Sequence, residues 1–180
     1  MSAGIAIDAN IEGLAGVGDA FSRMVRLGYR PRPIWDAIGQ YGESSTRLRF
    51  KNQRDPEGKR WVPSMRAQQF GPGRTLIRSA RLLRNISYNA DDRGTSWGSN
   101  VIYARIHNDG GEIKAKGGGA LRFRLPSGAF VTVKKVTIPQ RTFIGVNAED
   151  AREMQQLAVE VLYNAARNPS AGYSVGKDGA

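Results

Sequence analysis

The sequence predicts an α+β fold, in which N-terminal helices and a C-terminal helix pack on a mainly antiparallel sheet with hairpins. Apolar residues recur at steps of three and four near both ends of the chain, as they do along one face of a helix. Between these segments, residues 85–138 hold short runs of β-branched and alternating residues. These runs are separated by glycine and proline turns, a pattern that is typical of hairpins.

Three helices are expected before the sheet. The first covers residues 10–27 and precedes a glycine, which is common just after a helix end. The second covers residues 33–52 and begins with a proline, which fits the first turn of a helix. After a turn at residues 55–58 and a long basic loop over 59–73, a short third helix is expected within 76–83.

Two hairpins are expected to form the sheet. The first pairs residues 85–89 with 95–99 around an Asp-Asp-Arg-Gly turn. The second spans residues 120–138, and its return strand is expected to run without interruption over 130–138, where β-branched residues are frequent.

The last helix is the clearest element of the sequence. Asn147 stands where it can cap the helix, and Glu149 and Asp150 lie in the first turn, where carboxylates favour the helix dipole. Its apolar stripe predicts packing against a core and consists of Ala151, Met154, Leu157, Ala158, Val161, Leu162 and Ala165. We expect one domain over residues 1–169 and a flexible tail over 170–180.

The residue types present argue against most enzyme chemistry. The chain has no cysteine and a single histidine, His107, so neither a Cys-His dyad nor a zinc site built from these ligands can form. No glycine-rich segment ends in the Gly-Lys-Ser/Thr of a phosphate-binding loop. No apolar run approaches the ~20 residues that span a bilayer, and the first residues do not resemble a signal peptide. We expect no catalytic residue, metal, cofactor or membrane contact.

Positive charge is concentrated in two parts of the chain. The net charge is +11, residues 22–84 alone carry +11 and residues 114–141 carry +7, while the remaining segments are acidic. Two interpretations stay open: a cationic face directed at DNA or at an acidic neighbour, or arginines dispersed over solvated helix surfaces. The candidate interface or DNA-facing residues are Arg47, Arg49, Lys51, Lys134 and Lys135.

Four short segments carry a family resemblance. They read PEGKRWVP at 56–63, LIRSARL at 76–82, YARIHNDGG at 103–111 and IPQRTFIG at 138–145. In this order they resemble the phage virion morphogenesis or tail completion family, which includes the Mu-like virion morphogenesis proteins, and the resemblance spans roughly residues 34–165. The residues that carry it are Gly58, Trp61, Leu76, Leu82, Tyr103, Ala104, His107, Gly110, Gly111, Pro139, Arg141, Phe143 and Gly145.

The segments also depart from the family pattern. Ala80 stands where the family usually has glycine, which predicts a more regular helix because alanine is the stiffer residue. Gln140 and Thr142 also differ from the residues usual in the fourth segment. We expect Trp61 and Phe143 to be buried, and we interpret the aromatic and histidine positions as architecture rather than as a ligand site.

The resemblance implies a structural virion protein of a tailed phage. Such a protein is made in the host cytoplasm, completes the tail or joins the tail to the head, and acts in a ring at the neck. The first expected partner is the protein itself, in a ring of six copies by analogy with tail symmetry. Neck, connector and tail proteins are further expected partners, and packaged DNA is expected to be contacted non-specifically. Two alternatives remain: an independent non-specific DNA-binding protein that uses residues 22–84, and a small hydrolase with a carboxylate metal site.

Overall fold

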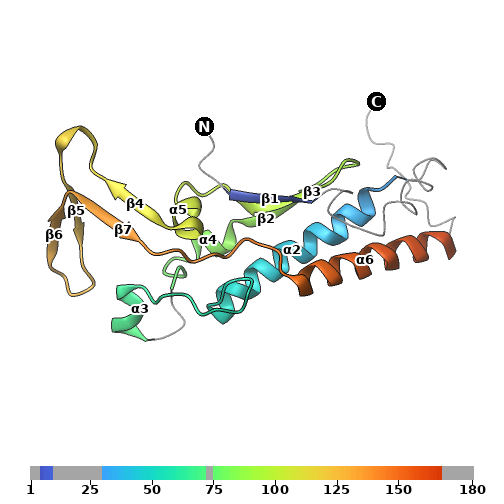
Figure 1. Cartoon of the computed structure of the whole chain (residues 1–180), viewed down its shortest axis with the longest axis horizontal. Helices are drawn as coiled ribbons and strands as arrows, with labels where there is room; N and C mark the ends of the chain where they lie inside the picture. Colours follow the sequence, from blue (N-terminus) through green and yellow to red (C-terminus); the bar gives the residue numbers. More distant parts are fainter. Residues whose placement is uncertain (1–4, 10–29, 72–74, 168–180) are drawn as a thin grey trace, which may run out of the picture.

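The computed structural model describes residues 5–9, 30–71 and 75–167. These residues form an elongated molecule with a helix-and-sheet body and a β-ribbon arm that projects from one end, as Figure 1 shows. The α+β class predicted from the sequence is therefore confirmed. The expected helix over residues 10–27 and the tail over 170–180 lie outside the described residues.

The body is built around α2 (Arg32–Asn52) and a three-stranded antiparallel sheet. The sheet contains β1 (Ile5–Ala9), β2 (Ile86–Ala90) and β3 (Thr95–Ser99) in the order β1-β3-β2. The β2–β3 hairpin was predicted, whereas β1 was not. Gly42 lets α2 approach the sheet closely, because a Cβ atom there would come within 2.5 Å of the Trp97 ring.

The C-terminal helix α6 (Ala148–Arg167) packs along α2, on the side away from the sheet in Figure 1. Of its predicted apolar stripe, Met154, Ala158 and Leu162 are buried, as expected. They join one core cluster with side chains from α2 and the sheet: Ile34, Trp35, Ile38, Ala90 and Trp97. The helix thus reaches the sheet through a core that is shared with α2.

A second core cluster lies at the end of α2 that is nearer the arm. It gathers Phe50, Trp61, Leu82, Ile86, Val101, Ala104, Phe143 and Ile144. Two short helices contribute to it, α4 (Arg81–Arg84) and α5 (Ala104–Asp109), and a third short helix, α3 (Met65–Phe70), follows Trp61 in the chain. The expected long loop over 59–73 was therefore wrong in part, because Ser64 accepts a hydrogen bond from the Ala67 amide and caps α3.

The arm consists of two antiparallel ribbons over residues 111–138. β4 (Gly111–Lys114) pairs with β7 (Lys135–Ile138), and β5 (Leu121–Arg124) pairs with β6 (Phe130–Val133). A short 3₁₀ turn, η2 (Lys116–Gly118), connects β4 to β5. The chain therefore runs out along one ribbon, folds into a hairpin and returns.

Two expectations for residues 85–138 were wrong. These residues do not form one sheet, because their strands belong to three separate sheets. The return strand over 130–138 is interrupted by a bend at Lys134, whose carbonyl accepts a hydrogen bond from the Ala115 amide. The bend lets the two halves of this segment pair with different strands, β5 and β4.

Candidate assembly surfaces

A buried ion pair joins α2 to the start of α6. Nη2 of Arg49 lies 2.6 Å from Oδ2 of Asp150, and both side chains are less than a tenth exposed. Nη1 of Arg49 also donates to the carbonyl oxygens of Phe143 and Gly145, at 3.1 and 2.8 Å. Arg49 therefore does not belong to an exposed basic face. Its assignment as an interface or DNA-facing residue was wrong, because its charge is neutralised inside the fold.

The Asp150 carboxylate collects further donors. Its Oδ1 accepts from the Tyr41 and Ser45 hydroxyls at 3.1 and 2.8 Å, and its Oδ2 accepts from the Asn147 amide. The Asn147 side chain in turn accepts from the Asp150 amide, so the predicted cap is present as a reciprocal pair. Burial and the Asp150 charge raise the pKa of Tyr41 to about 12. Burial lowers the pKa of Arg49, an effect that Asp150 opposes.

All four family segments contribute side chains to the second core cluster. The Trp61 indole packs edge-on against Phe50, with ring centroids 5.3 Å apart, and its Nε1 donates to the Thr142 carbonyl. The Phe143 ring lies on the same Phe50 side chain at 5.0 Å. Trp61 is 6% exposed and Phe143 is fully buried, so the predicted burial of both is confirmed.

The third and fourth segments are joined through polar contacts at α5. The Asn108 side chain, 5% exposed, accepts from the Phe143 and Ile144 amides at 2.9 and 3.0 Å. Nε of Arg141 donates to the Val62 carbonyl, and the Arg141 amide donates to the His107 carbonyl. Asn108 was missed in the sequence, because an isolated asparagine gives no signal of burial.

His107 serves this junction through its backbone and its ring packing. Its ring lies edge-on to Tyr103, with centroids 5.8 Å apart, and Ala104 beside them is fully buried. Burial, and then the positive charge of Arg141, lower the pKa of His107, which favours a neutral ring at pH 7. These contacts are those of a packed junction.

The glycines of these segments occupy turns and points of close approach. Gly58, Gly110 and Gly111 have positive φ angles of 81°, 72° and 138°. A Cβ atom at Gly110 would lie 2.8 Å from the Gln140 amide, so the two ends of the arm, next to Gly111 and Pro139, are in contact. At Gly145, a Cβ atom would lie 2.6 Å from the Pro56 ring.

The second family segment corrects another expectation. Leu82 is buried, but Ala80 adopts a left-handed conformation with φ 52° and precedes α4 instead of extending it. Leu76 also has a positive φ, of 64°. The expected regular helix over 76–83 was therefore wrong: Ala80 takes the backbone conformation that glycine, the usual family residue, adopts without strain.

The other candidate basic residues divide between α2 and the arm. Arg47 is paired with Glu43 at 2.8 Å and donates to the Ile86 carbonyl, whereas Lys51 is exposed at the end of α2. Lys134 and Lys135 are exposed on the arm, and Lys135 is paired with Glu112 at 2.8 Å. The predicted basic residues therefore do not form one continuous face. Lys134 and Lys135 lie on the arm, apart from the basic residues of α2.

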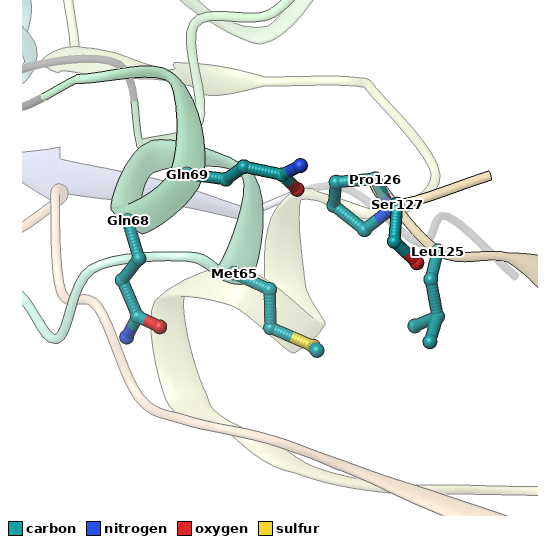
Figure 2. A pocket seen from close by; sticks show the side chains of 6 residues that line it. All are labelled: Met65, Gln68, Gln69, Leu125, Pro126 and Ser127. Atoms are coloured by element: carbon teal, nitrogen blue, oxygen red, sulfur yellow. The ribbon is translucent and has the colours of Figure 1, made fainter. Parts of the chain in front are cut away.

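The arm is basic and has no core of its own. It holds six lysines and arginines against one acidic residue, Glu112, and no residue from 111 to 138 is buried. A hollow of about 290 Å³ lies between α3 and the turn that connects β5 to β6. Figure 2 shows Met65 and Gln69 of α3 facing that turn. The hollow is open and lined by Met65, Gln68, Gln69, Leu125, Pro126 and Ser127. It lacks the enclosed, mainly apolar walls of a typical small-molecule site.

Among the described residues, no group of three or more histidine or acidic side chains is placed to hold a metal ion. Within the same ranges, no helix is both long and apolar enough to span a membrane.

Comparison with known proteins identifies the group to which the chain belongs. The model of the phage virion morphogenesis family matches residues 13–163, most of the chain, and the family resemblance drawn from the four segments is thereby confirmed. The chain belongs to the phage virion morphogenesis family. Its role is accordingly in the structure or assembly of a phage virion, with which it is associated. No curated protein and no solved structure matches the chain.

Proposed function

We propose that this protein completes the tail of a tailed phage or joins the tail to the head, and that it works as a ring of identical copies in the neck region. The observation that carries the proposal is the basic arm, which is attached to a folded body but buries none of its own residues. Within the phage virion morphogenesis family, such a surface is suited to packing against another virion protein. Six copies are expected, by analogy with tail symmetry.

The proposed mechanism is oligomerisation without catalysis. Complementary basic and acidic surfaces on neighbouring copies would steer association and fix its register. The ring would then present one end to connector proteins of the neck and the other to the tail, with its inner wall near the packaged DNA. No cofactor is required for this role, and no catalytic residue is assigned.

Two measurements test this proposal. In lysates of a phage that lacks the protein, full heads and separate tails should accumulate, and purified protein should restore their joining. Imaging of the complete particle should place the chain in a ring at the upper end of the tail. Infectious particles assembled without the protein, or its location elsewhere in the virion, would contradict the proposal.

Self-association provides a further test in solution. Because the proposed contacts between copies are partly ionic and exposed, rings of the purified protein should dissociate as the salt concentration rises. Sedimentation velocity at low and high salt measures this directly. Rings that are equally stable at both salt concentrations would argue for an interface without an electrostatic component.

Independent DNA binding is the second candidate function. The arm is a better candidate for the DNA-contacting surface than α2, because its basic residues are exposed. Non-specific binding would weaken steeply with salt, because phosphate contacts release counterions. Gel-shift titrations of duplex DNA distinguish the two functions. Tight binding by free monomers, together with normal virion joining in the absence of the protein, would favour the DNA-binding function.

A further inference from the structure

The β5–β6 hairpin presents a cationic face that carries an exposed aromatic ring. Its register places Arg124 opposite Phe130 and Arg122 opposite Thr132, so these side chains share one face. The Arg122 guanidinium lies over the Phe130 ring at 4.9 Å from its centroid. Phe130 is nevertheless 64% exposed, a large value for a phenylalanine.

This hairpin is poorly stabilised by its own chain. Its strands pair only with each other, and none of its residues is buried. A two-stranded ribbon without a packed face is marginally stable in water. A partner surface that covers Phe130 would therefore supply the burial that the monomer lacks.

The outer face of α6 has the complementary character. Glu149, Glu153, Glu160 and Tyr163 follow one another at steps of four, seven and three residues, which places them on one side of the helix. This side is opposite the buried stripe that packs on α2. The same side also exposes two apolar side chains, Val159 at 56% and Tyr163 at 59%, together with Arg152, so its net charge is −2.

The two surfaces lie apart along the molecule. In Figure 1 the β5–β6 hairpin forms one end of the longest axis, while α6 begins near the middle and runs toward the other end. A chain therefore cannot bring them together within itself without unfolding the arm. A contact between different patches on successive copies is heterologous, and such contacts close into rings when the rotation between copies permits.

We propose that the Arg122, Arg124 and Phe130 face of one copy docks on the Glu153, Glu160 and Tyr163 face of the next copy. This inference rests on the proposed ring and names its interface. The two arginines face carboxylates, which sets specificity and the rate of association. Phe130 packs beside Val159 and Tyr163, where burial of the aromatic ring supplies affinity.

Charge exchange between the two faces tests this interface. R122E/R124E and E153R/E160R should each raise the concentration needed for half-assembly at least tenfold, as measured by sedimentation velocity at low salt. A chain that carries all four substitutions should recover assembly, because every proposed pair is then reversed. The matched control is R78E/R93E, which makes the same charge change at two exposed arginines away from both faces and should assemble like the wild type.

Directed cross-linking supplies a readout that does not depend on charge. Because the chain contains no cysteine, T132C and Q156C each introduce a single thiol, the first beside Arg122 on the hairpin and the second on the outer face of α6. Under mild oxidation, a mixture of the two variants should give a disulfide-linked dimer of one T132C and one Q156C chain. Assembled variants that give no such product would overturn the interface.

The remaining outcomes separate the interface from the ring. If wild-type rings form and R122E/R124E leaves them intact, the interface is wrong and the ring proposal stands. If R122E/R124E keeps its rings but loses affinity for duplex DNA, the hairpin faces the DNA channel instead, which also overturns the interface. If the wild-type protein forms no ring in solution or in the virion, the proposed function itself fails and this interface fails with it.

Discussion

At the scale of single residues, the Arg49–Asp150 pair determines how the C-terminal helix is held. Both charges are removed from water, and each is surrounded by hydrogen-bond partners from α2, α6 and the segment that precedes α6. Replacing both partners of such a pair can cost little, whereas removing one leaves an uncompensated buried charge. The pair therefore makes the attachment of α6 sensitive to either residue.

We predict that R49A lowers the free energy of unfolding by about 3–5 kcal/mol, the range expected when one partner of a buried pair is lost. R49E should be at least as damaging, because it places a second carboxylate beside Asp150. Urea denaturation followed by circular dichroism measures the change. The control is K51A at the exposed end of the same helix, which should stay within about 0.5 kcal/mol of the wild type. Equal midpoints for R49A and K51A would show that the pair contributes nothing.

Tyr41 gives the same site a signature in alkaline solution. Its pKa in the folded protein is about 12, above the ordinary tyrosine value of 10.0, so folding favours the protonated phenol. The contribution of Tyr41 to stability is fully present below pH 10 and is lost as the pH rises toward 12. In Y41F this loss is absent, so urea midpoints measured from pH 9 upward should fall less steeply than in the wild type. Parallel curves for the two proteins would contradict the assigned pKa.

At the scale of elements, local sequence periodicity was sufficient to predict those elements that pack through one face. α2, α6 and the β2–β3 hairpin agree with the sequence prediction because their apolar spacing or turn residues are local signals. β1 was missed because its pairing with β3 joins residues about ninety positions apart, which no local pattern encodes. The bend at Lys134 was missed because β6 and β7 are both rich in β-branched residues.

The candidate surfaces, like the secondary structure, were predicted only in part from the sequence. Composition identified the two basic segments, but it could not separate a paired arginine such as Arg49 from an exposed lysine such as Lys134. The partner of Arg49 is about a hundred residues away, and charge alone does not reveal burial. The burial of Trp61 and Phe143 was predictable, because large aromatics beside apolar segments stabilise a fold by being buried.

The start of α4 provides a prediction for one element. Ala80 has φ 52°, a left-handed conformation that costs an L-residue about 1–2 kcal/mol. Glycine removes this strain but loses more backbone entropy on folding, by roughly 0.5–1 kcal/mol. We therefore expect A80G to stabilise the protein by about 0.5–1 kcal/mol, measured by urea denaturation. The control is A148G at the first residue of α6, where φ is helical and glycine should destabilise. Destabilisation by A80G would show that the left-handed conformation is not maintained in solution.

At the scale of the whole molecule, stability and assembly are assigned to different parts of the chain. Both core clusters lie in the body, and neither includes a residue of the arm. The arm carries five net positive charges and the exposed Phe130 ring, but no buried side chain. Substitutions in the arm are therefore expected to change association between copies, while substitutions in the core change folding of each copy.

Gly110 and Gln140 are in contact, so the chain leaves the body and re-enters it at the same point. The arm is therefore an insertion between two adjacent positions of the body. Excising residues 112–138 and joining the cut ends through two glycines should leave a shortened protein whose thermal midpoint stays within a few degrees of the wild type, as expected when no core contact is lost. Differential scanning calorimetry measures the midpoint, and a body that no longer unfolds cooperatively would show that the arm contributes to the fold. A protein with this topology can exchange its appendage without redesigning its core, so grafting the arm of a relative onto this body should transfer the relative's choice of neighbour.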